Sequence, residues 1–302
     1  MVVGGGDMNS LYICSTSSDF VAKVDLSDFK LKSKIYLKAR DFSYKIGPHG
    51  ICNRNDKIIT ANNYANSISI IDIKTDTEEE SYYIGAHCND IVTLDNKAYI
   101  ICSDSNSLIV FDLKYKKILE QIPCGNLPHS ICLNLKRRIL LVSNMQSNSV
   151  TLIDCDDTSN IKNIKVGSYP TKAIFTVDGE HILVCESNLG SESRGSISIL
   201  SLKNCKIINR IVVGNSPLDI YCNSRYCFIS NFGDGTVSMV DINNYKECKN
   251  IIVGGMPAGI LKYDRHLYIG DNYNNILIKF NIENNKKEFI PIGNEPTGMI
   301  IR

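Results

Sequence analysis

The sequence predicts an all-β protein, a seven-bladed β-propeller with four antiparallel strands in each blade. A phrase that runs glycine, two or three residues, proline, two residues and an apolar residue recurs seven times along the chain. Its proline position, called the anchor here, falls at Pro48, Cys88 (in place of proline), Pro128, Pro170, Pro217, Pro257 and Pro296. The steps between anchors are 40, 40, 42, 47, 40 and 39 residues, a period typical of repeat architectures. Each period holds four short apolar stretches, and none shows convincing helical periodicity.

The repeat that begins at Pro217 illustrates the four strands. Its apolar stretches are residues 218–222, 226–230, 236–241 and 248–253, separated by turn residues at 223–224, 233–235 and 243–244. The third stretch alternates between apolar and small polar residues in most copies, as in residues 67–72 and 149–154. Such alternation indicates a half-buried strand, and four strands per ~40 residues form one propeller blade.

The two ends of the chain predict how the ring closes. Pro296 is followed by only six residues, enough for one innermost strand, whereas the N-terminus supplies second, third and fourth strands at residues 11–14, 20–25 and 32–37. We therefore expect the first blade to be closed by the N- and C-terminal strands, which removes an open sheet edge. Residues 9–302 then form a single domain. Residues 1–8 fit no strand and are expected to be a leader added for expression or a disordered segment.

Residue patterns within the repeat separate this chain from other propellers. A WD-type repeat would carry Trp-Asp after its third strand, but the chain has no tryptophan, and a kelch repeat would carry Gly-Gly in every blade. The segments Val213-Gly214 to Pro217, Ser230-Asn231 and residues 235–241 (Gly-Thr-Val-Ser-Met-Val-Asp) instead resemble the YVTN family of seven-bladed propellers. The resemblance covers the chain from about residue 9. It implies the fold and says little about function, because propellers host many activities.

Composition excludes several classes of protein. The chain has 33 basic and 32 acidic residues and a net charge of +1, so we expect no nucleic-acid partner. It carries no signal peptide and no apolar run long enough to span a bilayer. Twelve cysteines without an export signal indicate a reducing compartment, so we expect a cytoplasmic monomer, with export still possible if a leader has been removed.

Two insertions indicate which face of the ring carries the functional site. The loops that carry the anchors and the loops between second and third strands should rim the same mouth of the central channel, where a rigid frame presents loops for function. Both insertions, each of seven extra residues, fall on this face, near residues 40–45 and 188–195. Their side chains are the candidate partner-binding residues: Arg40, Phe42, Tyr44, Asn188 and Arg194.

Three of the five histidines lie in the anchor loops of consecutive blades. His49 and His129 directly follow their anchors, and His87 precedes Cys88. Three imidazoles that converge with Cys88 or Asp90 would suit zinc or copper. The structural interpretation is that His49 and His129 bond to neighbouring loop carbonyls while His87 faces solvent.

Acid–base chemistry has two candidate carboxylates. Asp90 and Asp219 stand two residues after their anchors, where they should project towards the channel axis, as should Lys172. Propeller hydrolases use carboxylates, amides and a divalent ion at this mouth. Asp–Lys contacts between blades explain the same residues equally well.

Two functions from different classes follow. The first is a non-catalytic binding scaffold without a cofactor, whose anchor-loop face takes a protein, peptide or surface-polymer partner. The second is a metal-dependent, lactonase-like hydrolase with a divalent ion at the channel mouth. A redox or metal-storage role for the cysteines is a third, weaker hypothesis.

Overall fold

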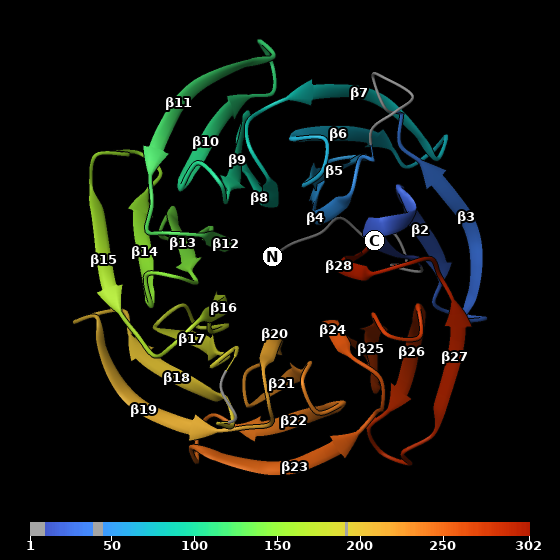
Figure 1. The fold of residues 1–302 in the computed structure, drawn as a ribbon, viewed down its shortest axis with the longest axis vertical. Helices are drawn as coiled ribbons and strands as arrows, with labels where there is room; N and C mark the ends of the chain where they lie inside the picture. Colours follow the sequence, from blue (N-terminus) through green and yellow to red (C-terminus); the bar gives the residue numbers. More distant parts are fainter. Residues whose placement is uncertain (1–9, 39–44, 191–192) are drawn as a thin grey trace.

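Seven four-stranded antiparallel sheets form a closed ring in the computed structural model, which describes residues 10–38, 45–190 and 193–302 (Figure 1). This confirms the predicted fold class. Each sheet is one blade. Its innermost strand lies beside the central channel and its fourth strand lies on the outer surface. The described residues include one short 3-10 helix and no helix long and apolar enough to cross a membrane.

Blade 1 combines the two ends of the chain, and the next three blades follow in sequence. Blade 1 contains β28 (Pro296–Ile301), β1 (Ser10–Ser15), β2 (Phe20–Asp25) and β3 (Lys30–Tyr36), with the 3-10 helix η1 (Thr16–Ser18) after β1. Blade 2 contains β4 (Pro48–Arg54), β5 (Lys57–Asn62), β6 (Ser67–Asp72) and β7 (Thr77–Tyr83). Blade 3 contains β8 (Cys88–Leu94), β9 (Lys97–Cys102), β10 (Ser107–Asp112) and β11 (Lys117–Pro123). Blade 4 contains β12 (Pro128–Asn134), β13 (Ile139–Asn144), β14 (Ser149–Asp154) and β15 (Ile161–Lys165).

The last three blades repeat the same order. Blade 5 contains β16 (Pro170–Phe175), β17 (His181–Glu186), β18 (Ser196–Ser201) and β19 (Lys206–Val212). Blade 6 contains β20 (Pro217–Cys222), β21 (Tyr226–Asn231), β22 (Thr236–Asp241) and β23 (Lys246–Ile252). Blade 7 contains β24 (Pro257–Tyr263), β25 (His266–Asp271), β26 (Ile276–Asn281) and β27 (Lys287–Pro291). All seven anchors therefore stand at the first residue of an innermost strand.

The ring closes through the C-terminal strand. β28 pairs antiparallel with β1, with Leu11 opposite Ile301 and Ile13 opposite Met299. Beyond the pair, the backbones of Ser10 and Arg302 exchange two hydrogen bonds of 2.8 Å. The strand that ends the chain thus completes the blade that begins it, as the sequence predicts.

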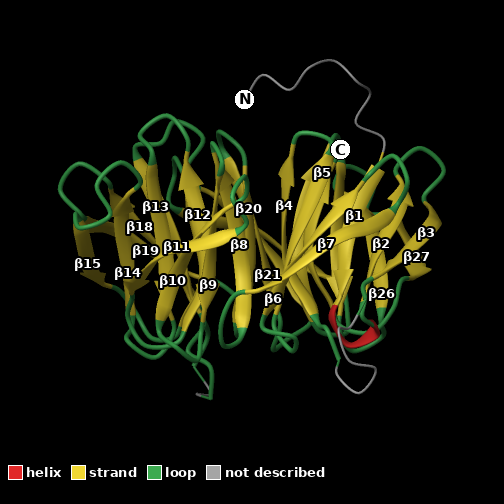
Figure 2. Cartoon of the chain, turned by 90° about the horizontal axis from the view of Figure 1, so that it is seen from above, coloured by secondary structure: helices red, strands yellow, loops and turns green. Residues whose placement is uncertain are grey.

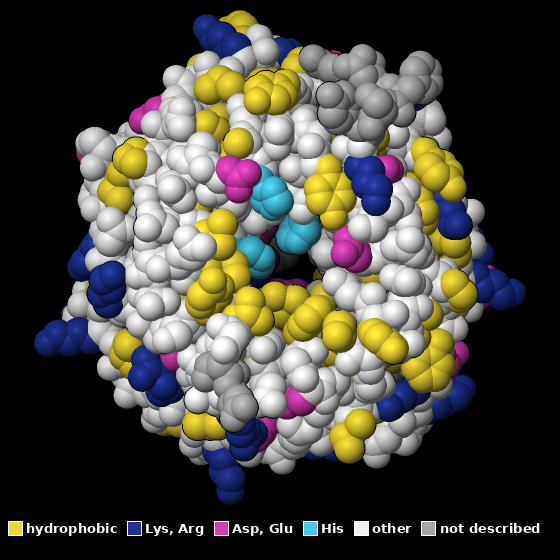
Figure 3. All heavy atoms as spheres, in the orientation of Figure 1, with side chains coloured by type: hydrophobic (Ala, Val, Ile, Leu, Met, Phe, Trp, Pro, Cys, Tyr) yellow, Lys and Arg dark blue, Asp and Glu magenta, His cyan; other side chains and the backbone are white. Residues whose placement is uncertain are grey.

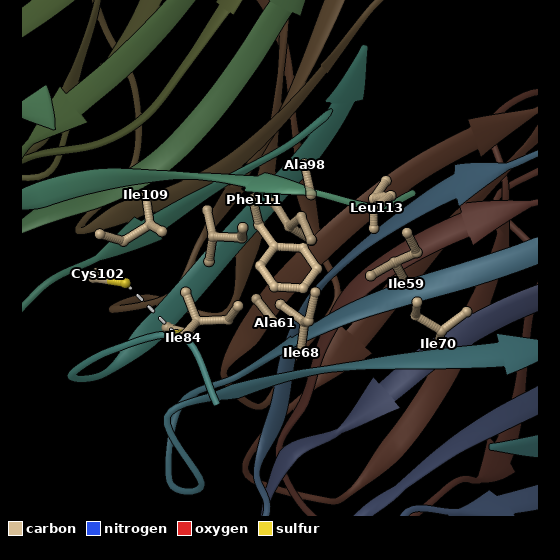
Figure 4. Close-up of a cluster of buried hydrophobic side chains, with 13 residues drawn as sticks. Ile59, Ala61, Ile68, Ile70, Ile84, Ala98, Cys102, Ile109, Phe111 and Leu113 are labelled. Carbon is tan, nitrogen blue, oxygen red and sulfur yellow. Dashed lines mark hydrogen bonds between the residues drawn. The ribbon is translucent and has the colours of Figure 1, made fainter. Parts of the chain in front are cut away.

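The hydrophobic core lies between neighbouring blades rather than within one blade. Figure 4 shows Phe111 of blade 3 beside Ala61 and Ile68 of blade 2, within a single cluster that also contains Ile59 and Ile109. Phe111 is only 2% exposed. Burying a side chain of this size contributes about 2–3 kcal/mol, so each interface stabilises both of its blades. The ring is consequently one cooperative unit.

A side-chain hydrogen bond clamps each of several anchor loops to the preceding blade. The Leu127 N–H before Pro128 donates to Asn106 Oδ1 (2.8 Å), and the Tyr169 N–H before Pro170 donates to Asn148 Oδ1 (3.0 Å). The bonds from His87 N–H to Asn66 Oδ1 (2.7 Å) and from Glu295 N–H to Asn275 Oδ1 (3.2 Å) are equivalent. These residues before the anchors are left-handed, with φ of 51–55°. A left-handed residue other than glycine costs about 1 kcal/mol or more, which the clamp offsets.

The anchor loops and the loops between second and third strands lie on one face, as predicted. The Met145 N–H donates to the Leu127 carbonyl (2.9 Å), and the Ser187 N–H donates to the Tyr169 carbonyl (3.0 Å). Each pair joins the two kinds of loop within one blade. We call this side of the ring the anchor face. Figure 2 shows the ring from its side, with loops on both faces.

Ring closure yields the first prediction. Removing residues 296–302 should lower the free energy of unfolding by about 4 kcal/mol or more, because Met299, Ile300 and Ile301 lose their contacts and β1 becomes an open edge. Urea unfolding followed by circular dichroism measures the change. A synthetic peptide of residues 293–302 should restore stability, whereas a scrambled peptide should not. Equal stability of the shortened and full chains would contradict the closure.

Candidate binding site at the channel mouth

A cavity of about 160 Å³ opens on the anchor face at the channel axis. Figure 3 shows this opening, with histidine side chains gathered on one side and hydrophobic side chains on the other. The positions one and two residues after the anchors supply most of the lining: His49, Gly50, Asp90, His129, Ser130, Lys172, Leu218, Asp219, Ala258, Gly259, Thr297 and Gly298. Asn272, which follows β25, completes it. The repeat itself therefore brings these residues together.

The residues directly after the anchors form an upper ring of contacts between blades. His49 Nδ1 lies 2.9 Å from the Asn89 carbonyl of the next blade, and His129 Nδ1 lies 2.8 Å from the Thr171 carbonyl. The Thr297 hydroxyl donates in the same way to the His49 carbonyl (3.2 Å). A carbonyl oxygen can only accept, so both imidazoles carry their proton on Nδ1. This confirms the structural interpretation for His49 and His129.

The two imidazoles are neutral bases at physiological pH. Burial lowers the pKa of both histidines, and it lowers that of His129 to about 4. Their ring centroids are 6.1 Å apart. With Nδ1 protonated and the ring uncharged, each Nε2 keeps a lone pair and acts as a hydrogen-bond acceptor.

The residues two after the anchors form a lower ring. Asp90 Oδ2 accepts the Ile131 N–H (3.1 Å), and Asp219 Oδ2 accepts the Ile260 N–H (3.0 Å), each from the next blade. Their Oδ1 atoms each accept the N–H of the following residue in their own blade, at 2.9 Å. Burial raises the pKa of Asp219. Both carboxylates therefore link neighbouring blades through backbone N–H groups, whereas the Asp–Lys contact expected from the sequence is present for Asp90, with Lys172.

Glycine occupies this lower position wherever the next blade comes closest. A Cβ atom on Gly50 would lie 2.6 Å from the Asp90 Cα, and one on Gly259 or Gly298 would overlap a carbonyl oxygen of the next blade. No side chain fits there. The lower ring is thus divided into an arc of direct backbone approach in blades 7, 1 and 2 and an arc of polar side chains in blades 3 to 6, where Asp90, Ser130, Lys172 and Asp219 enter the channel.

Lys172 of blade 5 lines the cavity and pairs with a carboxylate of blade 3. Its Nζ lies 3.1 Å from Asp90 Oδ2, so it joins blade 5 to blade 3. Burial alone would lower the pKa of this amine, but the Asp90 and Asp219 carboxylates outweigh it and raise the pKa above its ordinary value. Lys172 is therefore a permanent cation held by carboxylates.

His87 does not join the other two histidines in the lining. It is half-buried, and its left-handed backbone (φ of 55°) and N–H belong to the clamp with Asn66. Within the described ranges, no group of three or more His, Cys, Asp or Glu side chains is placed to hold a metal ion. The metal site of His49, His87 and His129 stays a prediction.

The two insertions contribute nothing described to the cavity. Arg40, Phe42 and Tyr44 lie outside the described residues. The Asn188 amide donates to the Arg194 carbonyl (2.8 Å). Arg194 donates from Nε to the Val213 carbonyl (2.7 Å) and also pairs with Glu247 at 3.6 Å. These two residues brace the loop after β17 and are absent from the cavity lining.

Asn272 is the lining residue that sequence reasoning missed. It comes from the loop after β25, away from any anchor, so no repeat signal singles it out. Its Oδ1 is buried and finds no hydrogen-bond partner among the residues that the structure describes. A buried acceptor without a partner costs about 1–3 kcal/mol.

Comparisons with known proteins support the fold alone. No protein-family model and no curated protein matches the chain. A functionally unknown protein from Desulfotomaculum acetoxidans is 15% identical, with a TM-score of 0.78 over 97% of this chain and 98% of its own. Kuenenia stuttgartiensis hydrazine synthase is 16% identical (TM-score 0.76, covering 95% and 93%), and a streptogramin B lyase structure is 14% identical (0.71, covering 86% of both). At these identities the matches establish a shared architecture without a shared function.

The lower ring yields the second prediction. Asp90→Ala should lower the free energy of unfolding by about 2–4 kcal/mol, because it strands the Ile131 N–H and leaves the Lys172 ammonium unpaired. Adding Lys172→Met should recover part of the loss in a double-mutant cycle. Urea unfolding provides the measurement.

A surface pair provides the control for this prediction. Asp56 pairs with Lys74 at 2.9 Å, but these side chains are 60% and 72% exposed. Asp56→Ala should therefore cost less than about 1 kcal/mol. An Asp90→Ala protein that loses no more stability than Asp56→Ala would count against the bridging role.

Proposed function

We propose that the protein is a non-catalytic binding propeller that takes a peptide or protein partner on the anchor face and admits one partner side chain into the channel mouth. The observation that carries the proposal is the two-sided cavity. One side presents hydrogen-bond acceptors, and the other is apolar. A lining of this kind orients a ligand that has a polar head and an apolar stem.

The acceptor side favours a donor on the partner. His49 Nε2 and His129 Nε2 keep lone pairs because their Nδ1 atoms donate to backbone carbonyls. Two acceptors on one side of a small cavity match an ammonium, a guanidinium or a phenol hydroxyl.

The opposite side favours an apolar stem. Leu218, Ala258 and Gly259 line it, contributed by blades 6 and 7. Leu218 is half-buried at the rim, so it can contact an inserted side chain and also exclude water around it. Lysine, arginine and tyrosine side chains each combine such a stem with a donor head.

The size of the cavity limits what enters. A volume of about 160 Å³ suits one side chain and excludes a folded element. The rest of a partner would then contact the loops of the anchor face, where both insertions occur. Asn188 and Arg194, the two expected partner-binding residues that the structure describes, lie in one of these insertions.

A metal-dependent, lactonase-like hydrolase is the second candidate. The observation that favours it is the fixed tautomer of His49 and His129, because metal-ligating histidines usually donate their other ring nitrogen to a carbonyl or carboxylate. This candidate requires one zinc, copper, calcium or manganese ion per chain, measured by elemental analysis, and loss of that ion in the His49→Thr, His129→Thr double variant. A chain without stoichiometric metal and without a thermal shift on metal addition would remove it.

Peptide selection provides the third prediction. Four libraries of random hexapeptides, each with lysine, arginine, tyrosine or leucine fixed at the centre, are panned on the immobilised protein. We expect enrichment of the lysine, arginine or tyrosine libraries over the leucine library, because only these supply a donor. In calorimetry, Leu218→Thr should weaken the best peptide about tenfold through lost apolar contact.

A threonine substitution on the opposite face serves as the control. Threonine already occupies the Leu218 slot in blades 1 and 5, at Thr297 and Thr171, so the variant should fold. Val177 is 66% exposed and follows β16, at the other end of the blade from the anchor, so Val177→Thr should leave binding unchanged. Absence of enrichment, or equal affinity of wild type and Leu218→Thr, would contradict the proposal.

A further inference from the structure

Two cysteines of blade 6 face each other across adjacent strands. Cys222 ends β20, and Cys227 lies directly opposite it on β21. Their Sγ atoms are 2.6 Å apart, with the Cys227 thiol donating to the Cys222 sulfur. The Cys222 thiol in turn donates to the Asn223 carbonyl at 3.1 Å. All twelve cysteines of the chain are free thiols in the structure.

The position of this pair in the hairpin suits a disulfide. The adjacent Asn223 N–H donates to the Tyr226 carbonyl (2.9 Å), and hydrogen-bonded and non-hydrogen-bonded pairs alternate along antiparallel strands. Cys222 and Cys227 are therefore a non-hydrogen-bonded pair, whose Cα atoms lie ~4.5 Å apart. This separation falls within the range that disulfides span. The sulfurs need to approach by about half an ångström to reach the bonded distance of ~2.05 Å.

The two thiols differ in access to solvent. Cys227 is fully buried, whereas Cys222 is half-buried beside the turn at the end of its strand. Burial raises the pKa of the Cys227 thiol far above its ordinary value. Cys222 is thus the thiol that an external oxidant reaches first, and Cys227 is positioned to complete the reaction.

A second cysteine pair provides an internal comparison. Cys88 and Cys102 also face each other across neighbouring strands, but their Sγ atoms are 3.6 Å apart and both residues are fully buried. Neither sulfur is open to a dissolved oxidant. Both pairs are therefore directly opposite residues on adjacent strands, but they differ in the distance between their sulfurs and in exposure to solvent.

We propose that Cys222 and Cys227 form a thiol-oxidation site that closes to an intrachain disulfide with glutathione disulfide or a similar small disulfide. The Cys222 thiolate attacks one sulfur of the oxidant, forming a mixed disulfide and releasing one thiolate. Cys227, on losing its proton, attacks the Cys222 sulfur and releases the second small thiol. Two protein thiols are oxidised, and one molecule of glutathione disulfide is reduced to two of glutathione.

One tryptic digest tests both pairs. Cleavage at Arg210, Arg225 and Lys246 places Cys222 and Cys227 alone in separate peptides, 211–225 and 226–246. Cleavage at Lys74, Lys97 and Lys114 separates Cys88 and Cys102 in the same way, in peptides 75–97 and 98–114. The full chain is reduced, freed of reductant, incubated in glutathione buffers of stepped ratio, alkylated with iodoacetamide and analysed by mass spectrometry.

We expect the linked peptides 211–225 and 226–246 at about tenfold or greater yield than any link between 75–97 and 98–114, because oxidation follows thiol access. Dithiothreitol should reverse the link. In the Cys227→Ser variant, Cys222 should retain glutathione as a mixed disulfide. Separate alkylation of Cys222 and Cys227 in wild type at every ratio, or equal linking of both pairs, would overturn the proposal.

Discussion

A hydrogen bond between a loop asparagine of one blade and the backbone N–H before the next anchor positions four of the seven anchors, and with them the innermost strands that build the channel mouth. Asn106 and Asn148 illustrate it, with partners at Leu127 and Tyr169. The bond supports a left-handed residue that would otherwise be strained. The next residue is the anchor, which stands at the start of an innermost strand. Every lining position except Asn272 is then one or two residues after an anchor.

The chemistry of the channel mouth depends on which side-chain donors and acceptors are not used in hydrogen bonds between blades. His49 and His129 use Nδ1 to bond to a carbonyl of the next blade, which leaves Nε2 as a hydrogen-bond acceptor. Asp90 and Asp219 use their carboxylates for backbone N–H groups, and Lys172 is held by Asp90. The carboxylates are therefore engaged as structural links, and the proposed binding function uses the histidine acceptors that remain.

The sequence predicts much of this arrangement because most channel residues stand one or two positions after an anchor. The strand number, the closure by the C-terminal strand, the shared loop face and the convergence of His49, His129, Asp90 and Asp219 all derive from the repeat. Spacing does not specify side-chain geometry. It therefore does not predict which ring nitrogen of His49 and His129 is hydrogen-bonded, that Lys172 reaches blade 3, or that Asn272 Oδ1 has no partner among the described residues. Cys222 and Cys227 flank a short turn symmetrically, a signal visible in the sequence yet separate from any metal-binding spacing.

Imidazole ¹⁵N spectroscopy of histidine-labelled protein tests the central claim most directly. The five histidines can be assigned with one variant each. At pH 7 we expect His49 and His129 to be neutral, with the proton on Nδ1 and an unprotonated Nε2. Neutral rings with the proton on Nε2 would contradict the carbonyl contacts, and charged rings would remove the lone pairs on the acceptor side of the mouth.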